Sequence, residues 1–483
     1  MMNVHSDKEL STGRRNIMPI ALTVLAWGMI AVFLFLIMKK KLSPFTALII
    51  VPLVFALAGS FMGLYTDQIV EIKKLADPSM VTFMDQIWIL GDFVLDGIKK
   101  TSTTGIMLLF AIFYFALMLD AGMFDPITRV MIKFANGDPL KVLFATAVVA
   151  ATVSLNGDGT TTTLITCTAF IPLYKKLGMK MMNLGVLVIL MNTIMNLLPW
   201  GGPTARVISV LPELNGMDSE VLRAVAPGMI LAVIYMLGVS IYMGFQERKR
   251  IGIKVLSETE LLELTSTDDE EILKIRRPHL FWPNLILTLT IVTLLMMEGT
   301  FPSVFLFLVG TVIALMMNYP NLKDQKTRLH ENSGDAVAVV ILVLGAGVFT
   351  GLFTVSGMSD ALAISLTKII PASFGRFWGL VVAFLSAPGT FFLSNDAFYY
   401  GVLPVLTEAG ATYGWTQMEL GVASLLGQAF HLLSPLVAFI YLLLQMTELD
   451  MGEWQKESAK WALGIFVIFI LVAGFTGAVP FIK

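Results

Sequence analysis

Long apolar segments separated by short polar ones follow one another along almost the whole chain of 483 residues. Most apolar segments hold about 20 residues, the length that an α-helix needs to cross the hydrocarbon core of a bilayer. The pattern predicts eight uninterrupted crossing helices: Ile17–Met38, Phe45–Leu64, Thr101–Leu119, Val225–Phe245, Leu280–Met297, Phe301–Met317, Ala336–Val355 and Trp461–Val479. The more polar, acid-rich segment Tyr65–Lys100 is expected to lie along the membrane surface.

Four further apolar segments carry polar residues or prolines in their middle. The segments 139–176 and 374–410 each divide into two arms of about 15 residues, too short for a full crossing. They are predicted to be re-entrant helical hairpins, with tips at Asn156–Asp158 and Ser394–Asp396. The segments 184–211 and 417–446 are predicted to be helices broken near Pro199 and Pro435. Charged groups and unpaired backbone are costly inside a bilayer, so such interruptions indicate a functional site.

Composition narrows the class of protein. Hydrophobic residues make up 56% of the chain and charged residues 14%, which is typical of a polytopic membrane protein. The formal net charge of −2 gives no reason to expect a nucleic-acid partner, and the lipid bilayer is the expected surrounding. The single cysteine, Cys167, excludes a disulfide framework within the chain and a thiolate metal site. The predicted fold class is therefore an all-α polytopic membrane protein.

The two halves of the chain match weakly but in order. Residues 1–245 would form a first repeat and residues 279–483 a second, joined by the polar loop 246–278. Four motif positions correspond at offsets of 232 to 238 residues, and Asp158 thereby aligns with Asp396. Basic residues concentrate in the loop, which places it in the cytoplasm and gives the repeats opposite orientations. This is the pattern of an inverted-repeat transporter, with its binding site near the midplane between discontinuous helices.

Candidate site residues gather at the interruptions, and each has a structural alternative. Asp158 and Asp396 suit metal ligation or proton transfer, but either could simply cap the following helix. Arg206 suits capture of a substrate carboxylate, but it could instead pair with a carboxylate of the protein. His431 could carry a proton near neutral pH or make a structural hydrogen bond.

The smaller polar residues at the breaks have the same two interpretations. The amide and hydroxyl oxygens of Asn156, Ser394 and Asn395 could bind a cation or could only reseal the backbone. Asn196 could line the same cavity or could make a hydrogen bond between helices. Thr160 and Thr161 lie nearest the first tip and are candidates for substrate binding. Thr162 and Thr163 are expected to bond the carbonyl one turn back.

Several motifs together resemble the bacterial citrate–divalent-metal:proton symporter family. They are L-N-G-D-G-T-T-T, I-P-L-Y-K-K-L-G, P-W-G-G-P-T-A-R, S-N-D-A-F-Y-Y-G-V-L-P and G-Q-A-F-H-L-L-S-P-L. The resemblance covers nearly the whole chain and implies an inverted-repeat fold with paired hairpins in a bacterial cell membrane. It places the helix breaks at Pro199–Thr204, which contains Gly201, Gly202 and Thr204, and at His431–Pro435, which contains Ser434.

The family resemblance also implies a function. It indicates uptake of citrate complexed with a divalent cation such as magnesium or calcium, coupled to protons, by a protein without a permanently bound cofactor. Asp158 and Asp396 would contact the metal of the complex. The chain has Asn156 where the family usually has an acid and Ala429 where it usually has proline. The loss of one acid could change which metal is accepted or whether a metal is needed. A homodimer is expected by analogy with fold relatives.

Three other functions are weighed against this one. A sodium-coupled transporter of free dicarboxylates or tricarboxylates would use Asn156, Ser394 and Asn395 as sodium ligands. An ion channel is disfavoured because the sequence has proline-broken helices and no repeated ring of pore residues. A membrane-embedded enzyme is disfavoured because the sequence contains no zinc-protease, serine-hydrolase or phosphate-loop motif.

Overall fold

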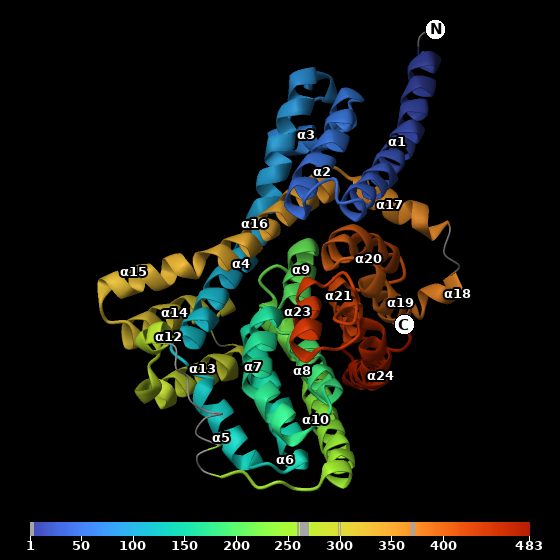
Figure 1. The fold of residues 1–483 in the computed structure, drawn as a ribbon. Helices are drawn as coiled ribbons and strands as arrows, with labels where there is room; N and C mark the ends of the chain where they lie inside the picture. The colour runs from blue at the N-terminus through green and yellow to red at the C-terminus, as the bar shows by residue number, and fades with distance from the viewer. Residues whose placement is uncertain (1–3, 258–259, 261–269, 298, 300, 369–371) are drawn as a thin grey trace.

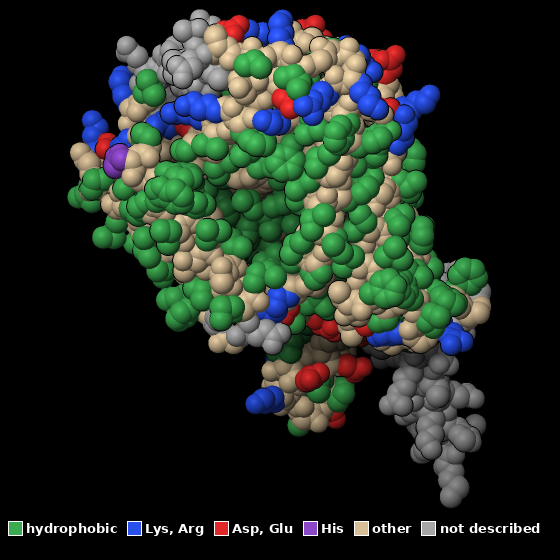
Figure 2. Space-filling model, turned by 90° about the horizontal axis from the view of Figure 1, so that it is seen from below, with side chains coloured by type: hydrophobic (Ala, Val, Ile, Leu, Met, Phe, Trp, Pro, Cys, Tyr) green, Lys and Arg blue, Asp and Glu red, His purple; other side chains and the backbone are tan. Residues whose placement is uncertain are grey.

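The computed structural model describes residues 4–257, 260, 270–297, 299, 301–368 and 372–483, and the regular elements within these ranges are all helical. Among the described residues, eight helices are long and apolar enough to cross a membrane. They include Pro139–Asn156, the first arm of a predicted hairpin, whereas Ser303–Asn318, a predicted span, is shorter. In Figure 2, hydrophobic side chains form a broad band, and most charged side chains lie in rims on either side of it. Large apolar side chains such as Trp282, Ile286 and Met316 are exposed. The chain is a multi-pass membrane protein, as predicted.

The order of elements is the same in the two halves of the chain. The first half contains α1 (Val4–Met38), α2 (Pro44–Phe61), α3 (Thr66–Lys73), α4 (Phe83–Asp120) and α5 (Asp125–Ala135) before its hairpin. The second contains α13 (Phe281–Met296), α14 (Ser303–Asn318), α15 (Leu322–Glu331), α16 (Ser333–Thr350) with the π-helical turn η5 (Gly351–Val355), and α17 (Met358–Thr367). The prediction for Tyr65–Lys100 is wrong from Phe83 onward, because α4 begins there and continues without interruption through the expected third span.

Each half then forms a hairpin, a broken helix and a final long helix. In the first half these are α6 (Pro139–Val153), η2 (Ser154–Asn156), α7 (Gly159–Leu177), α8 (Met181–Met195), α9 (Gly202–Val210) and α10 (Asp218–Ile251). In the second they are α19 (Trp378–Phe392), η6 (Ala397–Val402), α20 (Leu403–Ala411), α21 (Gln417–Leu426), α22 (Gln428–His431), α23 (Ala438–Thr447) and α24 (Met451–Thr476). The predicted fold class, with two hairpins and two broken helices, is confirmed. The exact domain boundaries stay predictions.

Left-handed glycines mark corresponding turns in the two halves. Gly122, after α4, has φ +75, and Gly357, after η5, has φ +81. Gly178, after α7, has φ +72, and Gly414, after α20, has φ +82. Glycine adopts this conformation without the cost that a Cβ would bring. These pairs lie 235 and 236 residues apart, which supports the repeat inferred from the sequence.

Two long helices, one from each half, form a wall beside the hairpins. In Figure 1, α4 and α16 run side by side between the α13–α15 corner and the helices that form the hairpins. Their backbones meet at glycines: a Cβ on Gly97 of α4 would lie 2.0 Å from the carbonyl oxygen of Gly347 and 2.8 Å from Cα of Gly351. Small residues permit this approach, as at other membrane helix crossings. We call α4 and α16 together the glycine-packed wall.

Candidate substrate site

The tip of the first hairpin is a tight turn stabilised by its own polar residues. The side-chain oxygen of Asn156 accepts a hydrogen bond from the Asp158 amide at 2.8 Å. Gly157 has φ +80. Asp158 then caps α7, since its carboxylate accepts the Thr160 amide at 3.3 Å and the Thr161 amide at 2.6 Å. The capping alternative for Asp158 is therefore confirmed, and these two amides are not free to bind a substrate carboxylate.

Capping does not remove Asp158 from the site. A carboxylate has about four lone-pair positions, so two amide bonds leave acceptor capacity. The Asp158 side chain is exposed and lines a cavity, as do Asn156, Thr160 and Thr161. The following threonines point elsewhere: Thr162 donates to the Asp158 carbonyl at 2.8 Å, as expected. The same expectation is wrong for Thr163, whose buried hydroxyl has no partner among the described residues.

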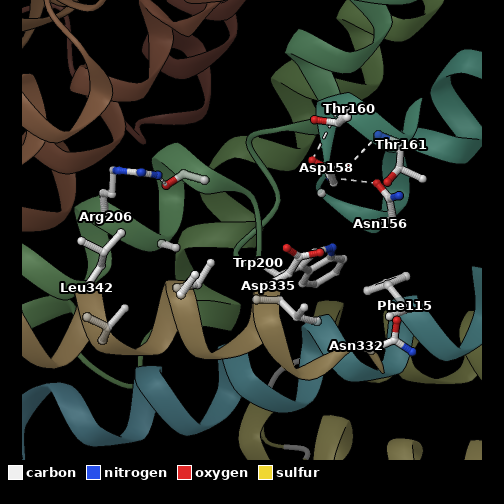
Figure 3. Close-up of a pocket in the computed structure, with 18 of the residues that line it drawn as sticks. Phe115, Asn156, Asp158, Thr160, Thr161, Trp200, Arg206, Asn332, Asp335 and Leu342 are labelled. Carbon is white, nitrogen blue, oxygen red and sulfur yellow. Dashed lines mark hydrogen bonds between the residues drawn. The ribbon is translucent and has the colours of Figure 1, made fainter. Parts of the chain in front are cut away.

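The cavity has a volume of about 530 Å³, within the roughly 300–1,000 Å³ typical of small-molecule sites. One side is the glycine-packed wall, which contributes residues of α4 and α16. The opposite side is formed by the first hairpin tip and α9, with Tyr400 of η6. Figure 3 shows Asp158 above the N-terminal part of α16 and Arg206 at the other end, above Leu342. The cavity thus lies between two groups of helices.

The break between α8 and α9 positions Arg206. Trp200 donates from its indole nitrogen to the Leu155 carbonyl at 2.8 Å, which ties the break to the first hairpin. The side-chain oxygen of Asn196 accepts the Gly202 amide at 3.3 Å, and Thr204 donates to the Leu197 carbonyl at 2.9 Å. Asn196 and Thr204 therefore satisfy backbone groups that the break leaves unpaired.

Gly201 and Gly202 serve the same break in different ways. A Cβ on Gly201 would lie 2.1 Å from the Asn196 carbonyl oxygen, so the turn has no room for a side chain there. Gly202 starts α9 and lines the cavity. Among the predicted residues of this break, the structure brings Gly202 and Arg206 to the cavity, whereas Asn196, Gly201 and Thr204 lie behind its lining.

Arg206 forms an ion pair with the tip of the second hairpin. Its Nε donates to Oδ1 of Asp396 at 2.7 Å, and its Nη1 donates to the Gly202 carbonyl at 2.7 Å. The two side chains are 22% and 19% exposed, so solvent reaches the pair only in part. Arg206 lines the cavity, whereas Asp396 is not among the lining residues. The structural alternative for Arg206, a carboxylate partner within the protein, is confirmed with Asp396.

The other predicted residues of the second half bond to one another and to backbone. Ser394 accepts the Ala397 amide at 3.2 Å, and Asn395 accepts Nε2 of Gln428 at 3.0 Å. His431 bonds through Nδ1 to the Thr390 carbonyl at 2.7 Å, and Ser434 donates to the Phe391 carbonyl at 2.6 Å. These residues join the second hairpin to the second break and do not line the cavity. The hydrogen bond expected from the structural alternative for His431 is therefore present, and a role of His431 in proton transfer stays a prediction.

The second break is longer than the sequence indicated. The prediction placed it at Ser434 and Pro435, but α21 already ends at Leu426 and α23 starts at Ala438. Only the short helix α22 lies between them. At the early interruption, Gly427 lies so close to the second hairpin that an added Cβ would be 2.2 Å from the Ser386 hydroxyl.

A metal ion held by the protein alone would need several ligating side chains. The described residues contain no group of three or more His, Cys, Asp or Glu side chains that could hold one. The two predicted metal-contacting residues also differ, because Asp158 lines the cavity and Asp396 is engaged by Arg206.

Sequence reasoning missed part of the cavity lining. Asp335 and Asn332, near the start of α16, line it from the glycine-packed wall, together with Phe115 of α4. Trp200 lies within the proline-rich break, and Tyr400 follows the second tip. Asp335 directly precedes a long apolar run, which was a usable signal. The other four carry no sign in the sequence that they share one cavity.

Comparisons with known proteins agree with this architecture. The profile of a family described as citrate transporter matches residues 32–430. The chain is 41% identical to a citrate transporter of Bacillus subtilis over 95% of this chain and 100% of that protein. It is 36% identical to a Mg(2+)/citrate complex secondary transporter of the same organism, over 95% of this chain and 99% of that one.

Among solved structures, the YdaH transporter of Alcanivorax borkumensis, described as having an unusual topology, is similar with a TM-score of 0.54. It is 14% identical, and the match covers 81% of this chain and 89% of that one, so it supports the fold alone. The family match and the two Bacillus alignments each extend over most of the chain, and they therefore establish the family to which the chain belongs. The chain belongs to the citrate transporter family and is a membrane transporter, not an enzyme.

Proposed function

We propose that the protein takes up citrate as a complex with a divalent cation, coupled to protons. One observation carries this proposal: a single cavity has a guanidinium at one end and carboxylates at the other. A citrate–metal complex also has two chemically different sides, free carboxylate oxygens and a cation. The family match and the relative that transports a magnesium–citrate complex support citrate as the anion.

Arg206 is the residue proposed to bind citrate carboxylate. It is the only Lys or Arg side chain in the described lining of the cavity, and a guanidinium can bind a carboxylate through two parallel hydrogen bonds. The first hairpin tip is less suited to this task, because Asp158 already occupies the Thr160 and Thr161 amides. The anionic part of the complex is therefore proposed to face Arg206.

The other end of the cavity is proposed to face the cation. Asp158 comes from the first hairpin and Asp335 from the glycine-packed wall, and Asn156 and Asn332 add amide oxygens. Magnesium and calcium prefer such oxygen ligands, and magnesium keeps several waters or substrate oxygens when protein ligands are few. Free citrate would bring its full negative charge beside two carboxylates, so the complexed form is favoured.

The position of the cavity suggests how it opens. The glycine-packed wall forms one side, whereas the first hairpin and α9 form the other. We propose that the hairpins and broken helices move against this wall and so expose the cavity to one side of the membrane at a time, by alternating access. Asp158, Asp396 and His431 are the proposed candidates for carrying the coupling proton.

Uptake of radiolabelled citrate by intact cells tests the proposal. We expect uptake to require a divalent cation and to fall at least about tenfold when a chelator removes it, a free-energy difference of about 1.4 kcal/mol. Magnesium, calcium, manganese, zinc and nickel are then added back separately. A protonophore should also abolish accumulation, whereas replacing sodium should not change it.

Two results would contradict the proposal. Chelator-insensitive uptake that requires sodium would identify a sodium-coupled carrier of free citrate. Absence of citrate uptake with every metal, in cells where the protein is present at wild-type amounts in the membrane, would exclude citrate as the substrate.

A further inference from the structure

We infer that citrate and Asp396 compete for Arg206, so that the substrate binds only when a proton neutralises Asp396. The inference rests on the proposed function and adds the step that couples the proton to the substrate. Its basis is the ion pair between a residue that lines the cavity and a residue that does not. In this structure Arg206 is paired with Asp396, and a substrate carboxylate would have to take the place of Asp396.

The Nε side and the charge of Arg206 are what Asp396 and a substrate carboxylate would compete for. A guanidinium has five N–H donors and two edges that can each bind a carboxylate through two parallel bonds. Asp396 occupies the Nε side at 2.7 Å, and the Gly202 carbonyl accepts from Nη1 at 2.7 Å. Two of the five donors are thus in use, so a substrate carboxylate that takes the Nε side must displace Asp396, which already compensates the charge of Arg206.

Among the titratable groups around the ion pair, Asp396 is the carboxylate that is expected to bind the proton. Titratable groups that interact electrostatically with Arg206 or Asp396 are Tyr399 and Tyr400 of η6 and His431 of α22. The ring of His431 is already bonded to the Thr390 carbonyl. Tyrosine is neutral at physiological pH, so it cannot compensate the guanidinium. Asp158 and Asp335 lie toward the opposite end of the cavity, as Figure 3 shows.

The exchange balances in charge and protons. A proton binds the carboxylate of Asp396 and forms a neutral carboxylic acid, and Arg206 keeps its proton and its positive charge. A citrate carboxylate then takes the place of Asp396 on the guanidinium. On the side of the membrane with fewer protons, Asp396 loses the proton, pairs with Arg206 again and displaces the substrate. One proton therefore accompanies each complex.

Calorimetry of the purified full-length chain in detergent tests this exchange. Citrate with excess magnesium is titrated into the protein in several buffers that differ in ionisation enthalpy. We expect uptake of about one proton per bound complex and an affinity that rises by up to about tenfold for each unit of pH decrease at constant concentration of the complex. Free protons released by citrate on chelation are measured without protein and subtracted.

Variants separate the exchange from a structural role of the pair. Asp396→Asn should bind the complex without proton uptake and with an affinity independent of pH. Asp396→Glu should restore both proton uptake and pH dependence. Glu220→Gln is the matched control, because Glu220 accepts from Arg223 at 3.1 Å in an ion pair at the start of α10, outside the cavity lining. It should behave as wild type.

The outcomes are distinct. Binding by the wild type without proton uptake would overturn the exchange and leave the proposed function intact, whether or not Asp396→Asn folds. Unchanged pH dependence in a folded Asp396→Asn variant would also overturn it. No binding of citrate, with or without magnesium, to folded wild-type protein would overturn the proposed function and the inference with it.

Discussion

The two hairpin tips present the same residue type to different surroundings. Asp158, in the first tip, caps its helix and is exposed to the cavity. Asp396, in the second tip, accepts a hydrogen bond from Arg206 and does not line the cavity. The difference shows that a repeat can place an acid at corresponding positions without giving it the same task. The role follows the partners: Asp158 accepts amides of its own hairpin, whereas Asp396 accepts from Arg206 of the other half.

The helices that follow the tips differ as well. α7 starts with a capped α-helical turn, because Asp158 accepts two amides there. The second arm starts as the π-helical turn η6, and Asp396 makes no capping bond. A π-helical turn inserts an extra residue and often marks a functional position. Here it contains Tyr399, which bonds Gln428 at 2.8 Å, and Tyr400, which lines the cavity.

Removing the arginine that joins the second tip to the cavity should have the largest effect. We expect Arg206→Lys to reduce citrate uptake at least about 100-fold, equivalent to ~2.7 kcal/mol, because lysine cannot form two parallel bonds with a carboxylate. Initial uptake rates, normalised to the amount of protein in the membrane, measure this. Arg223→Lys, in the ion pair with Glu220 near the start of α10, is the control. A loss of less than about threefold would contradict the role of Arg206.

Neutralising the first tip should have a smaller effect of a different kind. Asp158→Asn retains a capping side chain, so we expect α7 to stay intact while the apparent affinity for magnesium–citrate falls about tenfold. Proton uptake on binding should stay as in the wild type, in contrast to Asp396→Asn.

Asp450→Asn is the control for this prediction. Asp450 caps α24 by accepting two amides, as Asp158 caps α7, but it does not line the cavity. Loss of proton uptake in Asp158→Asn, with binding retained, would assign the coupling proton to the first tip.

A substitution in the glycine-packed wall, opposite the first tip, should have a smaller effect on substrate binding than Asp158→Asn. The exposed side chain of Asp335 has no ion pair or hydrogen bond among those of the described residues, and exposed charge interactions amount to roughly 0.2–1 kcal/mol. We therefore expect Asp335→Asn to lower the preference for magnesium–citrate over free citrate by about two- to fivefold. Competition assays with and without chelator measure this ratio. Asp324→Asn, an acid in the first turn of α15 outside the cavity, should leave the ratio unchanged.

The smallest effect is expected at the second break. His431 bonds the Thr390 carbonyl and is 6% exposed, so His431→Gln, which can still donate a hydrogen bond, should change uptake less than about twofold. His431→Phe loses the donor and should destabilise the protein by roughly 1–3 kcal/mol. Thermal unfolding and the pH profile of uptake are the measurements. A flattened pH profile in His431→Gln would assign the coupling proton to His431 instead of Asp396.

The lengths of the apolar segments and their polar interruptions were sufficient to predict most of the fold. The spans, both hairpins and both breaks follow from apolar length and from polar residues that a bilayer tolerates poorly. The segment before Thr101 was predicted wrongly because its acids suggested a surface location, whereas α4 carries Asp92 and Asp96 within one continuous helix. Composition alone does not show where a long helix leaves the membrane.

The site was predicted less completely, because local sequence patterns do not predict contacts between distant segments of the chain. The sequence identified Asp158, Arg206 and Asp396 as unusual, but not that Arg206 pairs with the tip of the other half, 190 residues away. It also could not show that Asp335 faces the first tip across a cavity. Those facts arise from packing of α16 against α4 and of α9 against η6.

The glycine-packed wall also constrains the order in which the protein is built. α4 ends at Asp120, whereas its partner α16 begins at Ser333, so roughly 210 residues must be synthesised between them. During that time Gly97 has no glycine partner, because Gly347 and Gly351 have not yet been made. Large membrane proteins whose contacts join distant segments pass through such incomplete states. The wall against which the hairpins are proposed to move can therefore be completed only after the whole first hairpin has been synthesised.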